Sequence, residues 1–109
     1  MTDVSAADAI TLAIEGGWVL DVREPDEWMC GHSPIAHSVP MSQLNERVGE
    51  LPTDQQILVV CHSGSRSLRA SDALRQAGFD SANVVGGMIA WHQAGGEIVA
   101  DGNEPARVD

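Results

Sequence analysis

A short segment near the middle of the chain combines the residue types that cysteine chemistry needs. It reads Cys61-His62-Ser63-Gly64-Ser65-Arg66-Ser67. The thiolate is the reactive form of cysteine, and the N–H groups of a tight loop and of a helix start both favour it. Gly64 lets the loop bend, and Arg66 adds positive charge for an oxyanion. The segment predicts a Cys61 nucleophile that acts on, or carries, a small anion.

The other residues of this loop and the second cysteine have more open roles. Ser63, Ser65 and Ser67 leave room for a substrate and supply hydrogen-bond donors. His62 either steers a substrate or a proton, or is an ordinary exposed loop histidine. Cys30 is either a second sulfur relay or a small buried hydrophobic residue, and the spacing to Cys61 favours the latter.

The elements around this loop indicate an α/β fold. The continuous apolar run at 57–60 is typical of a strand in a parallel sheet covered on both faces, and it ends directly before Cys61. Further strands are predicted at 18–22, 35–39, 82–85 and 97–99. Helices are predicted at 4–15, 41–51, 67–77 and 88–94, with a single helical turn at 24–29. Ser5 is expected to cap the first helix, and Leu68 and Ala77 are expected to face the core.

These elements predict one domain over residues 1–109. Its core spans about residues 4–99, and residues 101–109 form a polar, mobile tail. The expected architecture is an open, mostly parallel sheet of about five strands with helices on both faces. Ligands gather at the carboxyl ends of the strands in such sheets. Two segments compete for that edge, the Cys61 loop and the stretch at 21–24.

Composition excludes several classes of function. The formal net charge is −10, which argues against nucleic acid and anionic membranes as partners. The chain has no lysine, so Schiff-base chemistry and a Walker-type phosphate loop are excluded. No apolar run approaches the length of a membrane-spanning helix, and the N-terminus lacks the pattern of a secretory signal. Two cysteines are too few for a disulfide scaffold, and we expect a cytoplasmic protein.

Three segments together resemble the rhodanese-like domain family. Residues 21–28 (DVREPDEW) and 31–36 (GHSPIA) are similar to its first signature, residues 61–67 to its active-site loop, and residues 85–91 (VGGMIAW) to its late glycine-rich element. They occur in the family's order, and the resemblance runs from about Trp18 to about Val99. This chain departs from the family at Ser33 and Ile35, and it has His62 where arginine is common.

The resemblance implies a single-domain sulfurtransferase that needs no metal or organic cofactor. Cys61 would accept a sulfane sulfur from a donor such as thiosulfate and pass it to cyanide, or to a protein or low-molecular-weight thiol. The loop amides would stabilise the persulfide, and Arg66 would bind the anionic donor or hold the loop. Asp21 and Arg23 are expected to form a polar pair that braces the loop. His62 in place of arginine predicts weaker binding of dianionic thiosulfate.

Three alternatives remain beside this interpretation. A cysteine phosphatase or arsenate reductase needs five residues between cysteine and arginine, whereas four separate Cys61 from Arg66 here. A sulfur-carrier or protein-binding module would turn over little thiosulfate and bind one partner tightly. A zinc site made from Cys30, His32, His37, Cys61 and His62 would match no common zinc spacing.

Overall fold

Five strands pair in one sheet in the order β1-β5-β4-β2-β3, and all neighbouring strands run parallel. This computed structural model describes residues 3–108. The strands are β1 (Asp3–Val4), β2 (Trp18–Asp21), β3 (Ala36–Ser38), β4 (Ile57–Val60) and β5 (Ser81–Val84). The predicted open, parallel α/β sheet is confirmed. Its fifth strand was assigned wrongly, because β1 fills that place and Val99 forms only an isolated antiparallel bridge with His32.

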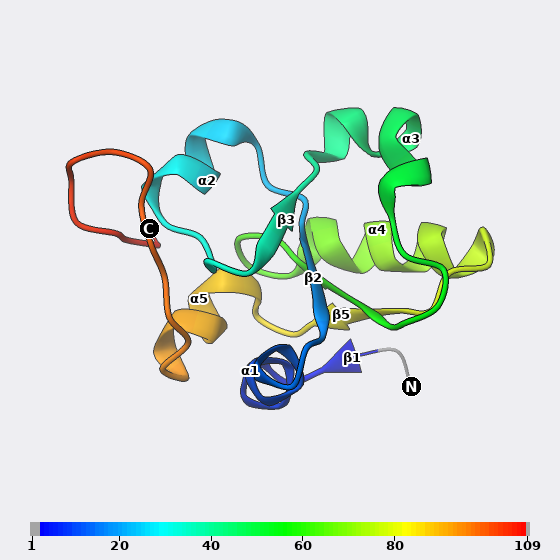
Figure 1. Ribbon diagram of the computed structural model, residues 1–109, viewed down its shortest axis with the longest axis horizontal. Helices are drawn as coiled ribbons and strands as arrows, with labels where there is room; N and C mark the ends of the chain where they lie inside the picture. The colour runs from blue at the N-terminus through cyan, green and yellow to red at the C-terminus, as the bar shows by residue number, and fades with distance from the viewer. Residues whose placement is uncertain (1–2, 109) are drawn as a thin grey trace.

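Helices cover both faces of the sheet (Figure 1). They are α1 (Ala6–Ile14), α2 (Pro25–Cys30), α3 (Leu44–Arg47), α4 (Ser65–Gln76) and α5 (Gly87–Gln93). One core lies between the sheet and α3 and α4, and a second lies between the sheet and α1 and α5. Among the described residues, no helix has the length and apolar character needed to cross a membrane.

The central strand β4 decides which way Cys61 points. Side chains alternate between the two faces of a strand. Ile57 and Val59 lie in the core under α3 and α4, whereas Leu58 and Val60 lie in the core against α1 and α5. Cys61 continues this alternation and belongs to the first core. The thiol is thereby directed toward α4, whose start follows the loop.

Several local predictions hold and others need correction. Ser5 caps α1 by accepting a hydrogen bond from the Asp8 N–H at 3.1 Å, as expected, but Val4 belongs to β1 and pairs with β5. The helix predicted at 41–51 is divided into 3₁₀ turns at Met41–Gln43 and Val48–Glu50 on either side of α3. Short 3₁₀ turns are common at helix ends, and the glycine at position 49 is a poor helix former.

The inner face of α4 also differs from the prediction. The helix begins at Ser65 rather than residue 67. Leu68 is 42% exposed and Ala77 is exposed, so the expectation that they face the core was wrong. Ser67 is fully buried on that face. The face nearest the sheet therefore carries two buried serines, Ser67 next to Cys61 and Ser71 one turn further along, beside the apolar Ala70 and Leu74.

The segment after α5 lies against α2. The Asp101 N–H donates to the Met29 carbonyl at 3.1 Å, and the Arg107 N–H donates to the Cys30 carbonyl at 2.8 Å. The predicted tail at 101–109 is therefore tied to the body of the molecule at two points, as the red and orange trace beside α2 shows (Figure 1). Residue 109 lies outside the described residues.

Candidate active site

Cys61 follows β4 directly, and hydrogen-bond donors surround its sulfur. The Gly64 N–H donates to Sγ at 3.1 Å, and the Ser67 hydroxyl lies 3.3 Å from Sγ. The loop turns back over the sulfur because Gly64 adopts a φ of 110°, a left-handed conformation that glycine adopts without strain. The structure thus brings the loop and the first turn of α4 around one thiol.

These donors lower the pKa of the Cys61 thiol. Burial is the largest single influence and raises the pKa. The Ser67 hydroxyl and the N–H groups of Ser67, Gly64 and Arg66 oppose it, and together they outweigh it. Hydrogen bonds to the sulfur stabilise the thiolate more than the thiol. The site therefore holds a cysteine with a raised fraction of its nucleophilic form.

A polar residue of β5 extends this network. The Ser67 hydroxyl lies 2.6 Å from Oδ1 of Asn83 and 3.2 Å from the Gly64 carbonyl, besides its contact with Cys61. A hydroxyl has one hydrogen, so it donates to one of these groups at a time. Asn83 is 5% exposed. Its side chain competes with the sulfur for the Ser67 proton and holds the Ser67 side chain in place.

Backbone hydrogen bonds join the start of α5 to the Cys61 loop. The Met88 N–H donates to the Cys61 carbonyl at 2.8 Å, and the Ile89 N–H donates to the His62 carbonyl at 3.2 Å. Gly87 has a φ of 58°, and a Cβ there would collide with both carbonyls. The late glycine-rich segment of the sequence therefore anchors the Cys61 loop, and the close approach of the two carbonyls requires glycine at position 87.

Arg66 is held by α2. Its two terminal nitrogens donate to the two carboxylate oxygens of Glu27, each at 2.8 Å. This pair lowers the pKa of Glu27 to about 2, chiefly through the Arg66 hydrogen bonds, and raises the pKa of Arg66. The guanidinium is thus engaged by a carboxylate in this structure and holds the start of α4 against α2.

Asp21 and Arg23 form a buried ion pair at 2.8 Å, and both side chains are almost fully buried. Arg23 also donates to the Gly31 carbonyl at 2.8 Å and to the Glu27 carbonyl at 3.4 Å. The groups that the pair holds belong to α2 and the turn after it. One link from this pair to the Cys61 loop therefore runs through α2 and the Glu27–Arg66 pair, and another runs through the sheet, where Asp21 pairs with Val60.

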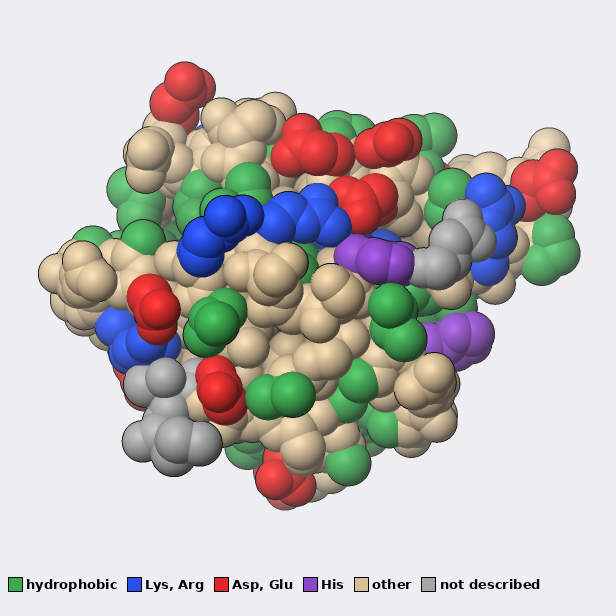
Figure 2. All heavy atoms as spheres, turned by 180° about the vertical axis from the view of Figure 1, so that it is seen from behind, with side chains coloured by type: hydrophobic (Ala, Val, Ile, Leu, Met, Phe, Trp, Pro, Cys, Tyr) green, Lys and Arg blue, Asp and Glu red, His purple; other side chains and the backbone are tan. Residues whose placement is uncertain are grey.

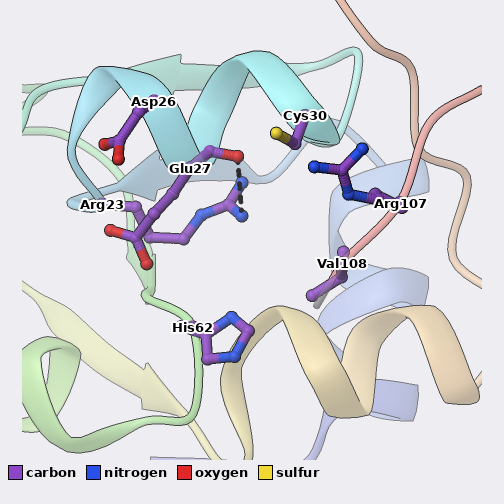
Figure 3. Close-up of a pocket in the computed structure, with 7 residues that line it drawn as sticks. All are labelled: Arg23, Asp26, Glu27, Cys30, His62, Arg107 and Val108. Atoms are coloured by element: carbon purple, nitrogen blue, oxygen red, sulfur yellow. Dashed lines mark hydrogen bonds between the residues drawn. The ribbon is translucent and has the colours of Figure 1, made fainter. Parts of the chain in front are cut away.

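A pocket of about 410 Å³ opens beside the loop. His62 forms part of its floor, and its other walls come from α2 and the end of the chain (Figure 3). Seven residues line it, namely Arg23, Asp26, Glu27, Cys30, His62, Arg107 and Val108. Ser63 and Ser65 are exposed at the outer side of the loop. The structure thus places Cys30 in a pocket next to the Cys61 loop, although Cys61 itself is covered.

On the face seen in Figure 2, adjoining blue side chains form a short stripe near the upper middle, with red side chains and a purple histidine beside it.

Sequence reasoning missed two residues that shape this site. Asn83 could have been noticed as a lone amide within an apolar stretch, and Glu27 as an acidic residue inside the first signature. Neither signal indicates which group the side chain of Asn83 or Glu27 contacts.

Among residues 3–108, no group of three or more His, Cys, Asp or Glu is arranged to hold a metal ion.

Fold and site together define an α/β protein with an activated cysteine at the carboxyl end of a central parallel strand. Comparison with known proteins identifies its family. The rhodanese-like domain family matches residues 5–94. The chain belongs to that family, as the resemblance in the sequence predicted.

The relatives cover most of this chain. A protein named sulfurtransferase from Allochromatium vinosum is 39% identical over 83 residues, which are 75% of this chain and 78% of that protein. A putative sulfur carrier protein, YrkF, from Bacillus subtilis is 38% identical over 67% of this chain, but the match spans only 40% of YrkF. The crystal structure of a rhodanese-related protein from Thermoplasma volcanium superposes with a TM-score of 0.86 at 34% identity, covering 93% of this chain and 100% of the other.

Proposed function

We propose that this protein is a sulfurtransferase that carries a sulfane sulfur on Cys61. The observation that carries the proposal is the set of donors around the Cys61 sulfur, which lower its pKa and would equally stabilise a terminal persulfide anion. Names of relatives support this class of activity, since one is called a sulfurtransferase and another a putative sulfur carrier.

The proposed reaction has two displacement steps. The Cys61 thiolate attacks the outer sulfur of thiosulfate, the S–S bond breaks, and sulfite leaves with the bonding electrons. Cyanide or a thiolate then attacks the outer sulfur of the persulfide, and the Cys61 thiolate leaves. Each step conserves charge and needs no external oxidant or reductant, so this covalent route requires no cofactor.

Access to the sulfur requires a small movement. Cys61 is 0% exposed, so the donor approaches from the pocket beside His62 while the exposed part of the loop moves aside. Both cysteines are free, as sulfur transfer by a thiol requires and as the reducing cytoplasm maintains. We propose a cytoplasmic location. Ser63 and Ser65 are exposed on the loop and do not line that pocket, so we assign them to the part of the loop that moves to admit the substrate.

Intact-mass measurement tests the proposal directly. Wild type, Cys61→Ser and Cys30→Ser are incubated with thiosulfate and then with cyanide. We expect a gain of one sulfur, about 32 Da, on wild type and Cys30→Ser but not on Cys61→Ser, and its removal by cyanide. If wild type stays unmodified, mercaptopyruvate and a cysteine persulfide follow as donors. Failure with all three donors would exclude sulfur transfer through Cys61 and favour a binding module.

The four-residue spacing between Cys61 and Arg66 separates this proposal from a phosphatase. Cysteine phosphatases surround a tetrahedral oxyanion with a longer loop and its arginine. Here the arginine is also held by Glu27. We expect no hydrolysis of an aryl phosphate or reduction of arsenate by a preparation that gains sulfur from thiosulfate.

A further inference from the structure

The inner face of α4 meets β5 through two pairs of buried polar side chains. The Ser67 hydroxyl lies 2.6 Å from Oδ1 of Asn83, and the Ser71 hydroxyl lies 3.3 Å from that of Ser81. The two serines of α4 are one helical turn apart, and Asn83 and Ser81 are two residues apart on a strand, so each pair shares one face of its element. The place of Asn83 beside Ser67 therefore follows from how the helix lies on the strand.

The pair nearer the start of α4 also reaches the reactive sulfur. Ser67 Oγ lies 3.3 Å from Sγ of Cys61, and the amide oxygen of Asn83 competes with that sulfur for the one hydroxyl hydrogen. Cys61 and Ser67 are fully buried and Asn83 is 5% exposed, so water has little access to them. Whichever acceptor loses the hydrogen therefore also loses hydrogen-bond energy.

The charge on Sγ changes during the proposed reaction, whereas Asn83 stays neutral. A hydrogen bond to an ionised acceptor is about twice as strong as one to a neutral acceptor. In the thiolate, Sγ carries the charge and attracts the Ser67 hydrogen. In the persulfide, the charge lies on the outer sulfur, and Sγ becomes a weaker acceptor than the amide oxygen of Asn83. The favoured acceptor of the Ser67 hydrogen thus alternates with the state of Cys61.

We propose that Asn83 is a positioning residue for sulfur transfer, which holds the Ser67 hydrogen away from Sγ in the thiol and persulfide forms and releases it when Cys61 carries the negative charge. Ser67 is the donor that touches the reacting sulfur, and Asn83 acts through it. Rotation of one hydroxyl suffices, and neither residue makes or breaks a covalent bond. In the second displacement the bonding electrons return to Cys61, and Ser67 then stabilises the leaving thiolate. This inference rests on the proposed function.

The proposal implies that Asn83 restrains ionisation of Cys61, because the bond from Ser67 to the thiolate forms at the expense of the bond to Asn83. Asn83→Leu keeps a side chain of similar size and removes the competing acceptor. Alkylation of Cys61 by iodoacetamide is followed by peptide mapping across a range of pH. We expect the midpoint of the profile to fall by about 0.5 pH unit, or about threefold in the thiolate equilibrium. Well below the midpoint the rate should rise about twofold, since a thiolate of lower pKa is less nucleophilic.

Charged side chains near Cys61 are unchanged in this variant. Arg66 of α4 interacts electrostatically with Cys61, His62 adjoins it, and the buried Asp21–Arg23 pair lies at the end of β2. Neither β4 nor β5 contains a charged residue. A lower midpoint in Asn83→Leu therefore reports on the hydrogen bond to the sulfur rather than on a lost or added charge.

A double-variant comparison shows whether the effect passes through Ser67. Ser67→Ala has no hydroxyl hydrogen, so adding Asn83→Leu to it should leave the midpoint of Ser67→Ala unchanged. Ser81→Ala removes the matching polar contact on β5 and should keep the wild-type profile. If Asn83→Leu lacks the cooperative urea transition of wild type, Asn83→Ala replaces it with the same expected direction. A midpoint at or above that of wild type, or an equal fall without the Ser67 hydroxyl, would overturn the proposal.

Single-turnover discharge tests the role in sulfur transfer. Wild type and Asn83→Leu are loaded with sulfur from thiosulfate, and loss of that sulfur to cyanide is followed by mass. We expect discharge to be about twofold faster in Asn83→Leu, because the leaving thiolate no longer competes with Asn83 for the Ser67 hydrogen. Equal or slower discharge by a normally loaded variant would refute this role. If wild type accepts no sulfur from any donor, the proposed function fails, and the alkylation profile still decides whether Asn83 controls ionisation of Cys61.

Discussion

The ion pair between Glu27 and Arg66 is expected to stabilise the fold measurably. Its partners lie 39 residues apart in the chain and join α2 to the start of α4. The pair lowers the pKa of Glu27 from 4.5 to about 2, and each pKa unit corresponds to about 1.4 kcal/mol, so full coupling would amount to roughly 3 kcal/mol. Both side chains are 29% exposed, and solvent screening reduces this value. We expect Glu27→Gln to lower the free energy of unfolding by about 1–2 kcal/mol at pH 7.

The pH dependence identifies the cause. A carboxylate whose pKa is lowered by folding stabilises the native state above its unfolded pKa of 4.5, and this stabilisation is lost as the pH falls toward 2. The difference between wild type and Glu27→Gln should therefore shrink to less than half by about pH 3. Urea denaturation at several pH values measures it. Glu50→Gln, which breaks the exposed Arg47 pair, serves as the control and should leave stability unchanged. Equal stability of Glu27→Gln and wild type at pH 7 would refute the reasoning.

Two further predictions concern the Cys61 loop. Ser67→Ala removes the hydroxyl that lowers the pKa of Cys61. Alkylation of Cys61 by iodoacetamide at pH 7 should therefore slow up to about tenfold. Ser71 is a buried serine of the same helix that bonds to Ser81 instead. In Ser71→Ala, Cys61 should therefore be alkylated at the wild-type rate, and equal slowing in both variants would contradict the assigned role of Ser67. Gly87→Ala should lose sulfur loading because its Cβ meets the loop carbonyls, whereas Gly95→Ala, also at positive φ but in open space, should keep it. Loading in Gly87→Ala at the wild-type level would count against an anchoring role for α5.

Residue patterns predicted most of the sheet. The apolar run of β4 is long enough to specify a strand, and its alternation directs Cys61 toward α4. The failures were short or marginal elements. β1 has two residues and exists through its pairing with β5, which no local pattern reveals. The stretch at 41–51 has helical periodicity, but only four of its residues form an α-helix.

The same distinction between local and distant contacts applies to the candidate site. The loop from Cys61 to Ser67 was visible because its residues are consecutive. The partners of that loop were not visible, since Glu27, Asn83 and Gly87 come from α2, β5 and α5. Arg66 illustrates the consequence. Its type and position predicted anion binding or support of the loop, and only the packing of α2 shows the carboxylate that engages it.

The sequence alone pointed to Cys61 as the candidate nucleophile, to the strand that ends before it and to the glycine that allows the loop to turn, because these depend on neighbouring residues and local backbone preferences. Which charges meet, which amides hold the loop and where residues 99–108 return became clear only from the tertiary structure. Those contacts depend on strand order and on the packing of helices across the sheet. Residues near the end of the chain, such as Arg107, thereby line a pocket together with α2, which lies far earlier in the sequence.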